Sequence, residues 1–215
     1  LTYNYGTHLM EGAGIKSIMA QARRLHIKVV DRSGQESHKT FAIYDQNRIP
    51  TIHRLNMGQS LKQLLRNAWP KDEVNILGRP VETDDLFIEI GQLTFASANL
   101  QSPQLISARL IIDGAKDTRL ENLLLNGVSL QSQATAVRIS NCTIQSDGIA
   151  GVYIDGESSA ILTGNTIQNC SQWGIYTKLK SAITIGGPEA RDKNLIKNNG
   201  YGIQLETVGT TDQPV

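Results

Sequence analysis

The second half of the chain repeats one short pattern, a glycine followed by alternating aliphatic residues, with a period of just over 20 residues. Four copies begin at Gly127, Gly151, Gly174 and Gly202, with steps of 24, 23 and 28 residues. Two further sets of alternating segments fall between these copies, beginning at Ala136, Ala160 and Ala182, and at Asn122, Cys142, Asn165 and Asn194. Three short alternating segments per period predict a solenoid with three strands per coil, because no single segment can bury its apolar side alone.

The composition is that of a folded protein with an uneven distribution of charge. Of 215 residues, 40% are hydrophobic and 19% charged, which is enough apolar material for a core. Residues 1–56 carry eight Lys and Arg against four Asp and Glu, whereas residues 57–215 carry 13 against 16. We therefore expect a small α+β segment over 1–56 and the solenoid over 57–215. The net charge of +1 gives no argument for nucleic acid, and no apolar run is long enough to span a membrane.

Local patterns predict a few elements ahead of the clear repeats. Apolar residues at helical spacing predict a helix over 13–25, and the runs 26–31 and 40–44 around a Ser-Gly turn predict a hairpin. Residues 60–69 read as a second helix, with Ser60 as its N-cap and a proline after its end. Alternating segments at 74–77, 86–90, 93–95 and 110–114 continue the β pattern into the repeats.

The repeats resemble the right-handed parallel β-helix of the pectate-lyase-like superfamily. The Gly-hydrophobic-x-hydrophobic, Asn-x-Ile and Asn-Asn-Gly elements of 122–206 carry this resemblance, and residues 60–76 are similar to the N-terminal capping helix and first strand of that superfamily. The fold it implies is mainly β: a right-handed parallel β-helix of four to five coils with an N-terminal capping helix. Residues 207–215 show no obvious cap, so we expect further coils or a protein partner at that end.

The resemblance says more about fold than about function. The superfamily includes polysaccharide lyases, polygalacturonases, uronan epimerases, phage tailspikes and surface adhesins, which favours an extracellular or cell-surface location. The Asn-Thr-Asp, Gly-His-Gly and Arg-Ile-Lys motifs of polygalacturonases, the Asp-Pro-His motif of epimerases and the calcium-binding nonapeptide are absent from the sequence. Enzymatic activity is therefore left open; an enzyme of this fold would be a polysaccharide lyase, hydrolase or epimerase.

Alternation within the strands predicts which side chains face outward. With the second and fourth residues of each glycine-led segment facing inward, the third residues form an outward row of Ser129, Tyr153, Tyr176 and Gln204. The residues two positions later form the next outward row of Gln131, Asp155, Lys178 and Glu206. Tyr153 and Tyr176 should then be neighbours on adjacent coils.

These rows suggest a carbohydrate site. Tyr153, Tyr176 and Trp173 offer flat rings that suit the C–H faces of sugars, and Asp155, Lys178, Glu206 and Gln204 offer polar contacts for hydroxyl groups or uronates. In an enzyme, Lys178 would be the base and Asp155 or Glu206 the acid or charge partner. The simpler interpretation is a cross-strand tyrosine pair beside a surface ionic row, in a structural or protein-interaction module such as a surface protein, phage spike segment or scaffold.

No cofactor, metal or nucleic-acid site is expected. Lys178 between two carboxylates disfavours calcium, and His8, His26, His38 and His53 lack metal-ligand spacing. A basic cluster in the front segment has no aromatic residues interleaved with it, so it does not indicate nucleic-acid binding; its members are Lys16, Arg23, Arg24 and Lys28.

Two rows of small polar residues recur at the corners of the coils. The first contains Asn122, Cys142, Asn165 and Asn194, and the second contains Asn126, Ser146, Asn169 and Asn198. Stacked asparagine side chains satisfy backbone groups of neighbouring coils, so we expect an asparagine ladder, with Cys142 as a small buried residue in one slot. Cys170 lies near a turn, where we expect it to be exposed, and the two cysteines are not expected to pair.

Overall fold

The structure, a computed structural model, describes residues 2–4, 9–11, 24–30, 36–42, 48–99 and 101–206. It divides into two compact units, Leu1–Ile49 and Pro50–Val215. Among the described residues, no helix has both the length and the apolar character that crossing a bilayer requires.

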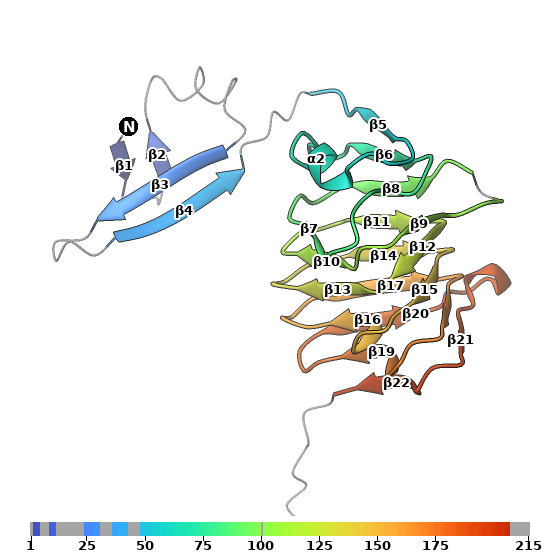
Figure 1. The fold of residues 1–215 in the computed structure, drawn as a ribbon. Coiled ribbons are helices and arrows are strands. Elements are labelled where there is room, and N and C mark those ends of the chain that lie inside the picture. Colours follow the sequence, from blue (N-terminus) through green and yellow to red (C-terminus); the bar gives the residue numbers. More distant parts are fainter. Residues whose placement is uncertain are drawn as a thin grey trace, which may run out of the picture. The chain divides into compact units, whose positions relative to one another are not determined.

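The first unit contains two antiparallel strand pairs (Figure 1). Strand β1 (Thr2–Asn4) pairs with β2 (Leu9–Glu11), and β3 (Arg24–Val30) pairs with β4 (Glu36–Ala42). The second pair confirms the predicted hairpin. The helix expected over 13–25 is wrong at its last two residues, which pair in β3, because the β-branched run that follows extends the strand backward. Its remaining residues up to 23 lie outside the described ones.

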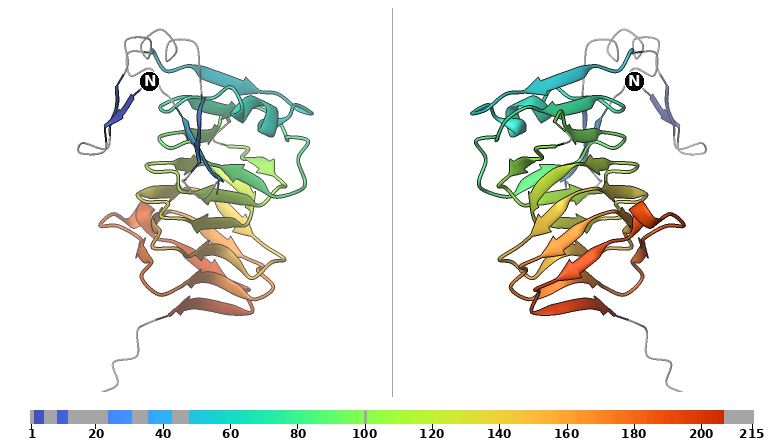
Figure 2. Two further views of the ribbon diagram at one scale, coloured as in Figure 1. Left: turned by 90° about the vertical axis from the view of Figure 1, so that its left-hand side faces the viewer. Right: turned by 90° about the vertical axis from the view of Figure 1, so that its right-hand side faces the viewer.

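The second unit is a solenoid built from three parallel sheets (Figures 1 and 2). The first sheet has six strands: β7 (Leu86–Ile88), β10 (Leu110–Asp113), β13 (Val128–Gln131), β16 (Ala150–Ile154), β19 (Trp173–Thr177) and β22 (Tyr201–Leu205). The second has seven: β5 (Ile52–Leu55), β6 (Glu73–Ile76), β8 (Thr94–Ser97), β11 (Arg119–Glu121), β14 (Val137–Ser140), β17 (Ser159–Thr163) and β20 (Ala182–Ile185). The third has five: β9 (Gln104–Ile106), β12 (Leu123–Asn126), β15 (Thr143–Gln145), β18 (Thr166–Gln168) and β21 (Leu195–Lys197).

The solenoid is longer than the four to five coils expected from the repeats. The first sheet alone has six strands, and β5, within the segment assigned to 1–56, pairs in parallel with β6 of the second sheet. The early segments were predicted as β but were not counted as coils, because their strands are short and do not follow the glycine-led pattern. In such strands the pairing partners, more than the local sequence, decide the structure.

The core is a set of aliphatic columns stacked from coil to coil. In the first sheet Val128, Val152 and Ile175 lie in register and are fully buried, as their alternation predicts. Burying a side chain of this size stabilises the fold by about 1.5–3 kcal/mol. The columns are the reason that the outward rows hold a fixed order.

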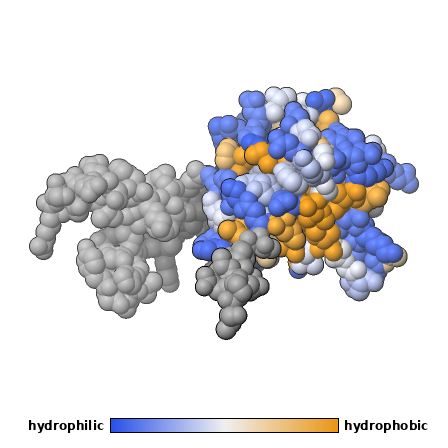
Figure 3. Space-filling model, turned by 90° about the horizontal axis from the view of Figure 1, so that it is seen from below, coloured by the Kyte–Doolittle hydropathy of each residue, from blue (hydrophilic) through white to orange (hydrophobic). Residues whose placement is uncertain are grey.

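The last described coil leaves the end of the core open. Ile203 continues the buried column but is 43% exposed, and Leu205 and Ile185 are 49% and 38% exposed. Figure 3, which views the molecule from below, shows a large hydrophobic surface there with polar residues around it. Strands β20, β21 and β22 are each the last of their sheet among the described residues, so one edge of each has no strand beside it.

A short α-helix, α2 (Leu61–Leu65), lies near the beginning of the solenoid. Ser60 is its N-cap as predicted, with its hydroxyl accepting from the Gln63 N–H at 3.0 Å. The helix spans five residues, much less than the 60–69 expected, so it is not a substantial capping helix. Pro70 disfavours helical backbone at Trp69 and so limits the helix to the residues before it, but it does not explain an end at Leu65. Leu61 and Leu65 are nevertheless buried in the core.

The side chain of Glu82, about 20 residues further along the chain, accepts hydrogen bonds from the N-terminal residues of this helix. Its carboxylate accepts from the Leu61 N–H at 3.0 Å and the Lys62 N–H at 2.9 Å, and the Ser60 hydroxyl also donates to it. Burial raises the pKa of Glu82, but the Ser60 hydroxyl and the two backbone donors outweigh burial and lower it below the usual value.

Glu82→Gln is expected to reduce the free energy of unfolding by about 1 kcal/mol at pH 7. Because the folded-state pKa is lowered, the contribution is present above the ordinary value of 4.5 and is lost as the pH falls through the folded pKa. Urea unfolding of both proteins at pH 7 and at about pH 3 measures this, and the difference in the free energy of unfolding should be smaller at the lower pH. A difference that stays constant with pH would contradict the role of the carboxylate charge.

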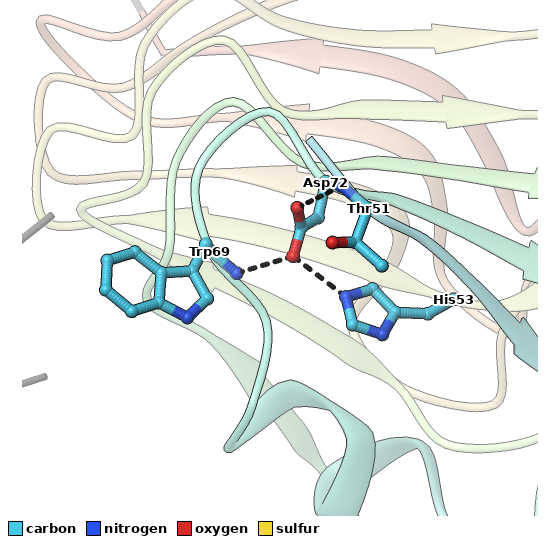
Figure 4. Close-up of polar contacts among 4 residues, drawn as sticks. All are labelled: Thr51, His53, Trp69 and Asp72. Atoms are coloured by element: carbon cyan, nitrogen blue, oxygen red, sulfur yellow. Dashed lines mark hydrogen bonds and ion pairs between the residues drawn. The ribbon is translucent and has the colours of Figure 1, made fainter. Parts of the chain in front are cut away.

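Asp72 ties the first two strands of the second sheet together (Figure 4). The carboxylate is fully buried and accepts from the Thr51 N–H at 2.7 Å and the Trp69 N–H at 3.0 Å. The Nε2 atom of His53 lies 2.8 Å from Oδ2 of the Asp72 carboxylate. His53 is thus a half-buried residue whose partner is a buried carboxylate.

The corner residues show two register corrections. In the second sheet Ala182 aligns with Ser159, so the set that begins at Ala160 is displaced by one residue. In the third sheet the strand β12 is displaced by one residue relative to both predicted rows. The slot of Cys142 is occupied by Leu123 and not by Asn122, and Asn126 aligns with Gln145 and not with Ser146. Both errors arise because the sequence pattern does not show where each corner places its extra residue.

Asparagine side chains do bond to the backbone of neighbouring coils at these corners. Asn165 is buried, its Oδ1 accepts from the Cys142 N–H at 2.9 Å, and its Nδ2 donates to the Ile139 carbonyl at 2.7 Å. Asn194, one coil further, accepts from the Asn165 N–H at 2.9 Å. A continuous asparagine ladder along the solenoid remains a prediction.

Candidate aromatic site on the first sheet

Parallel pairing of the last three strands of the first sheet brings the predicted outward row together. Tyr153 on β16 aligns with Tyr176 on β19, and Tyr176 aligns with Gln204 on β22. The ring centroids of the two tyrosines are 5.5 Å apart with an edge-to-face angle of 63°. This confirms that the tyrosines are neighbours, in a geometry that aromatic pairs prefer.

Two further rings extend the tyrosine pair. The ring centroids of Trp173 and Tyr176 are 5.9 Å apart. Trp173 also stacks on Tyr201, with their ring centroids 4.3 Å apart. We call Tyr153, Tyr176, Trp173 and Tyr201 the aromatic cluster. Tyr201, which is 61% exposed, was missed in the sequence analysis. It directly precedes Gly202, as Trp173 precedes Gly174, and this repeat position was the signal that could have found it.

A polar row runs beside the aromatic cluster. The Tyr153 hydroxyl donates to Asp155 Oδ2 at 3.0 Å, and the Tyr176 hydroxyl donates to Glu206. Lys178 Nζ lies 3.6 Å from the same Asp155 oxygen. All of these side chains are half-buried. The two phenols are therefore each oriented by a carboxylate on the row beside them.

The electrostatics of the row keep the phenols neutral. Burial, ahead of the Asp155 carboxylate, raises the pKa of Tyr153, although Lys178 opposes it. The hydrogen bond to Glu206 raises the pKa of Tyr176. Both hydroxyl groups therefore stay protonated at neutral pH and serve as hydrogen-bonding groups.

The same interactions keep Asp155 and Lys178 charged. Burial raises the pKa of Asp155, but the Gly156 N–H, the Tyr153 hydroxyl and Lys178 together outweigh it and lower the pKa. The Tyr153 hydroxyl and then the Asp155 carboxylate raise the pKa of Lys178. A general base has to be deprotonated, whereas these neighbours favour the ammonium form. The pKa direction thus favours a binding role for Lys178 over the base suggested from the sequence.

The cysteines offer no alternative nucleophile. Both are free and buried. Cys170 was expected to be exposed, but it is buried as part of the core cluster, and its N–H donates to Asn199 Oδ1 at 2.9 Å. Burial raises the pKa of Cys142 to about 12 and raises that of Cys170 as well, so neither forms a thiolate readily. Among the residues described, no group of three or more His, Cys, Asp or Glu side chains could hold a metal ion.

Three parallel sheets wound around one core define a β-solenoid with a three-strand coil. Residues 105–212 match the family described as "Right handed beta helix region", which is half of the chain. The protein therefore belongs to the right-handed β-helix family. No curated protein and no solved structure matches the chain.

Proposed function

We propose that this β-helix binds a carbohydrate on the aromatic cluster. The single observation that supports this most is the arrangement of four aromatic rings from three adjacent coils on one outward face, bordered by carboxylates and an ammonium group. Aromatic faces pack well against the apolar C–H surfaces of sugars, and neighbouring polar groups then take the hydroxyl groups. The cluster combines both properties.

The proposed role is binding without catalysis. Lys178 is held as a cation by Tyr153 and Asp155, and both phenols are held as neutral donors. The site thus contains hydrogen-bonding groups in stable protonation states. A lyase, hydrolase or epimerase would require a group that exchanges a proton near neutral pH.

The proposal predicts a large loss of binding when central rings are removed. Trp173→Ala and Tyr176→Ala should each weaken binding of the best ligand from a glycan array about tenfold or more, because buried Trp and Tyr residues supply most of the energy of such contacts. Phe87→Ala is the matched control: Phe87 lies outward on β7 of the same sheet and is 51% exposed, but it is far along the solenoid from the aromatic cluster.

Titration calorimetry on all four proteins provides the measurement, with circular dichroism to show that each variant is folded. Equal losses in the Phe87 variant and the two cluster variants would contradict a localised site. A folded wild type that binds no glycan at all would remove the proposal.

A second candidate function is supported by the open end of the solenoid. Ile203, Leu205 and Ile185 are partly exposed there, next to the outer edges of the last described strands. We propose that the occupant of this end is another three-stranded coil with inward aliphatic residues, since every earlier coil is covered by a coil of this kind. This interaction-module function becomes the leading one if the folded wild type binds no glycan.

A further inference from the structure

We infer that the aromatic cluster selects glycans without carboxylate or sulfate groups; this rests on the carbohydrate-binding function proposed above. The charges beside the rings carry the inference. Sequence reasoning alone allowed uronates, because Lys178 could have met their carboxylates. The pairing of the side chains in the structure makes that role unfavourable.

The row beside the rings is predominantly acidic. It runs from Asp113 through Gln131, Asp155 and Lys178 to Glu206, as the parallel pairing of successive coils places them. Three of these five side chains are acidic and one is basic. A polyanionic ligand laid along the aromatic cluster would therefore approach a surface of the same sign.

The nearby cations are already occupied. Lys178 Nζ lies 3.6 Å from the Asp155 carboxylate, and Lys180 Nζ lies 3.5 Å from that of Glu157. Recognition of a carboxylate or sulfate needs an available cation, best supplied by a bidentate arginine. To bind a uronate, Lys178 would have to give up its contact with Asp155 and leave that half-buried carboxylate without its cation.

The hydrogen-bonding character of the site points in the same direction. The Tyr153 hydroxyl donates to Asp155 and the Tyr176 hydroxyl donates to Glu206, so their protons are committed to the protein. What these two tyrosine–carboxylate pairs still offer a ligand is acceptors: two carboxylates and two phenolic oxygens. The hydroxyl groups of a neutral sugar can donate to these acceptors, and bonds to ionised carboxylates are the strong ones. A ligand carboxylate has no proton to donate.

The test compares neutral and uronic oligosaccharides of equal length and linkage, namely mannan with mannuronan oligomers. Titration calorimetry at low and at high NaCl should show that the wild type binds a neutral member at least about tenfold more tightly than its uronic counterpart at low salt. The difference in affinity between the neutral and the uronic oligomer should become smaller at high salt, because salt screens the repulsion. The affinity for the neutral oligomer should be almost unchanged. Glu206→Gln should reduce the same difference at low salt, whereas Asp113→Asn, further along the row, should change it less.

The outcomes separate this inference from the function on which it rests. Tighter binding of a uronic oligomer, lost in Lys178→Met, would overturn the inference and leave carbohydrate binding in place. Equal binding of neutral and uronic members at low salt would also overturn it. Absence of binding to every oligomer by folded protein would remove both proposals.

Discussion

Ile154→Ala is expected to lower the free energy of unfolding by about 2–5 kcal/mol, the range for a fully buried aliphatic side chain. Ile154 has no exposed surface and lies in the middle of the solenoid, in register with Leu130 on one side and Thr177 on the other. Both neighbours are fixed by their own strands, so the surroundings cannot collapse into the space that the side chain leaves. The cost therefore includes a cavity as well as lost burial.

Leu205→Ala provides the control, because Leu205 occupies the same repeat position two coils further on. It is 49% exposed, so its truncation should cost less than about 1.5 kcal/mol. Chemical denaturation of both variants, followed by circular dichroism, gives the comparison. Similar losses for the two positions would show that the end of the solenoid is covered in solution, against the exposure described above.

Gly174→Ala should be the most damaging of the conservative changes to the repeat, with a loss of about 1–3 kcal/mol or more. A Cβ at this position would lie 2.7 Å from the Gly202 carbonyl oxygen and 2.7 Å from Asn199 Nδ2. The carbonyl belongs to the next strand and cannot move without disturbing the parallel pairing. The glycine is thus required by the close approach of the coils at this corner.

Gly202→Ala tests this explanation at the equivalent position in the last described coil, where a Cβ would meet no atom within 4 Å. We expect this variant to be neutral or slightly stabilising, because alanine restricts the unfolded chain more than glycine does. Thermal unfolding of the pair decides the matter. Loss of stability at both glycines would mean that backbone conformation, and not the next coil, explains the repeat.

Alternation within strands could be predicted from the sequence, whereas corner geometry could not. The inward column of Val128, Val152 and Ile175 follows from a period of two and is confirmed. Asn122 was assigned to the slot of Cys142, but it adopts a left-handed backbone with φ of 54°, as its true equivalent Asn141 does with φ of 53°. Asparagine occurs both at corners with left-handed backbone and at buried positions where its side chain bonds to the neighbouring coil. The residue type alone does not distinguish these two roles.

The candidate site shows the same division between what the sequence predicts and what packing decides. That Tyr153 and Tyr176 lie side by side on adjacent coils followed from the repeat. The stacking of Trp173 on Tyr201 did not, because both residues precede a glycine at a strand start, where simple alternation no longer gives the direction of the side chain. The pairing of Lys178 with Asp155 likewise depends on side-chain conformation.

The in-register stacking of the three sheets implies that the solenoid can become longer or shorter along its axis only by whole coils. A single residue inserted within β16 would turn the following side chains to the opposite face and break the columns on both sides. A complete coil inserted between β16 and β19 would preserve the register of the columns, with the new strands pairing on both sides, and would move Tyr153 and Tyr176 apart by about 4.8 Å. Equivalent groups along the outer face are therefore separated by whole multiples of one fixed spacing, the thickness of a coil.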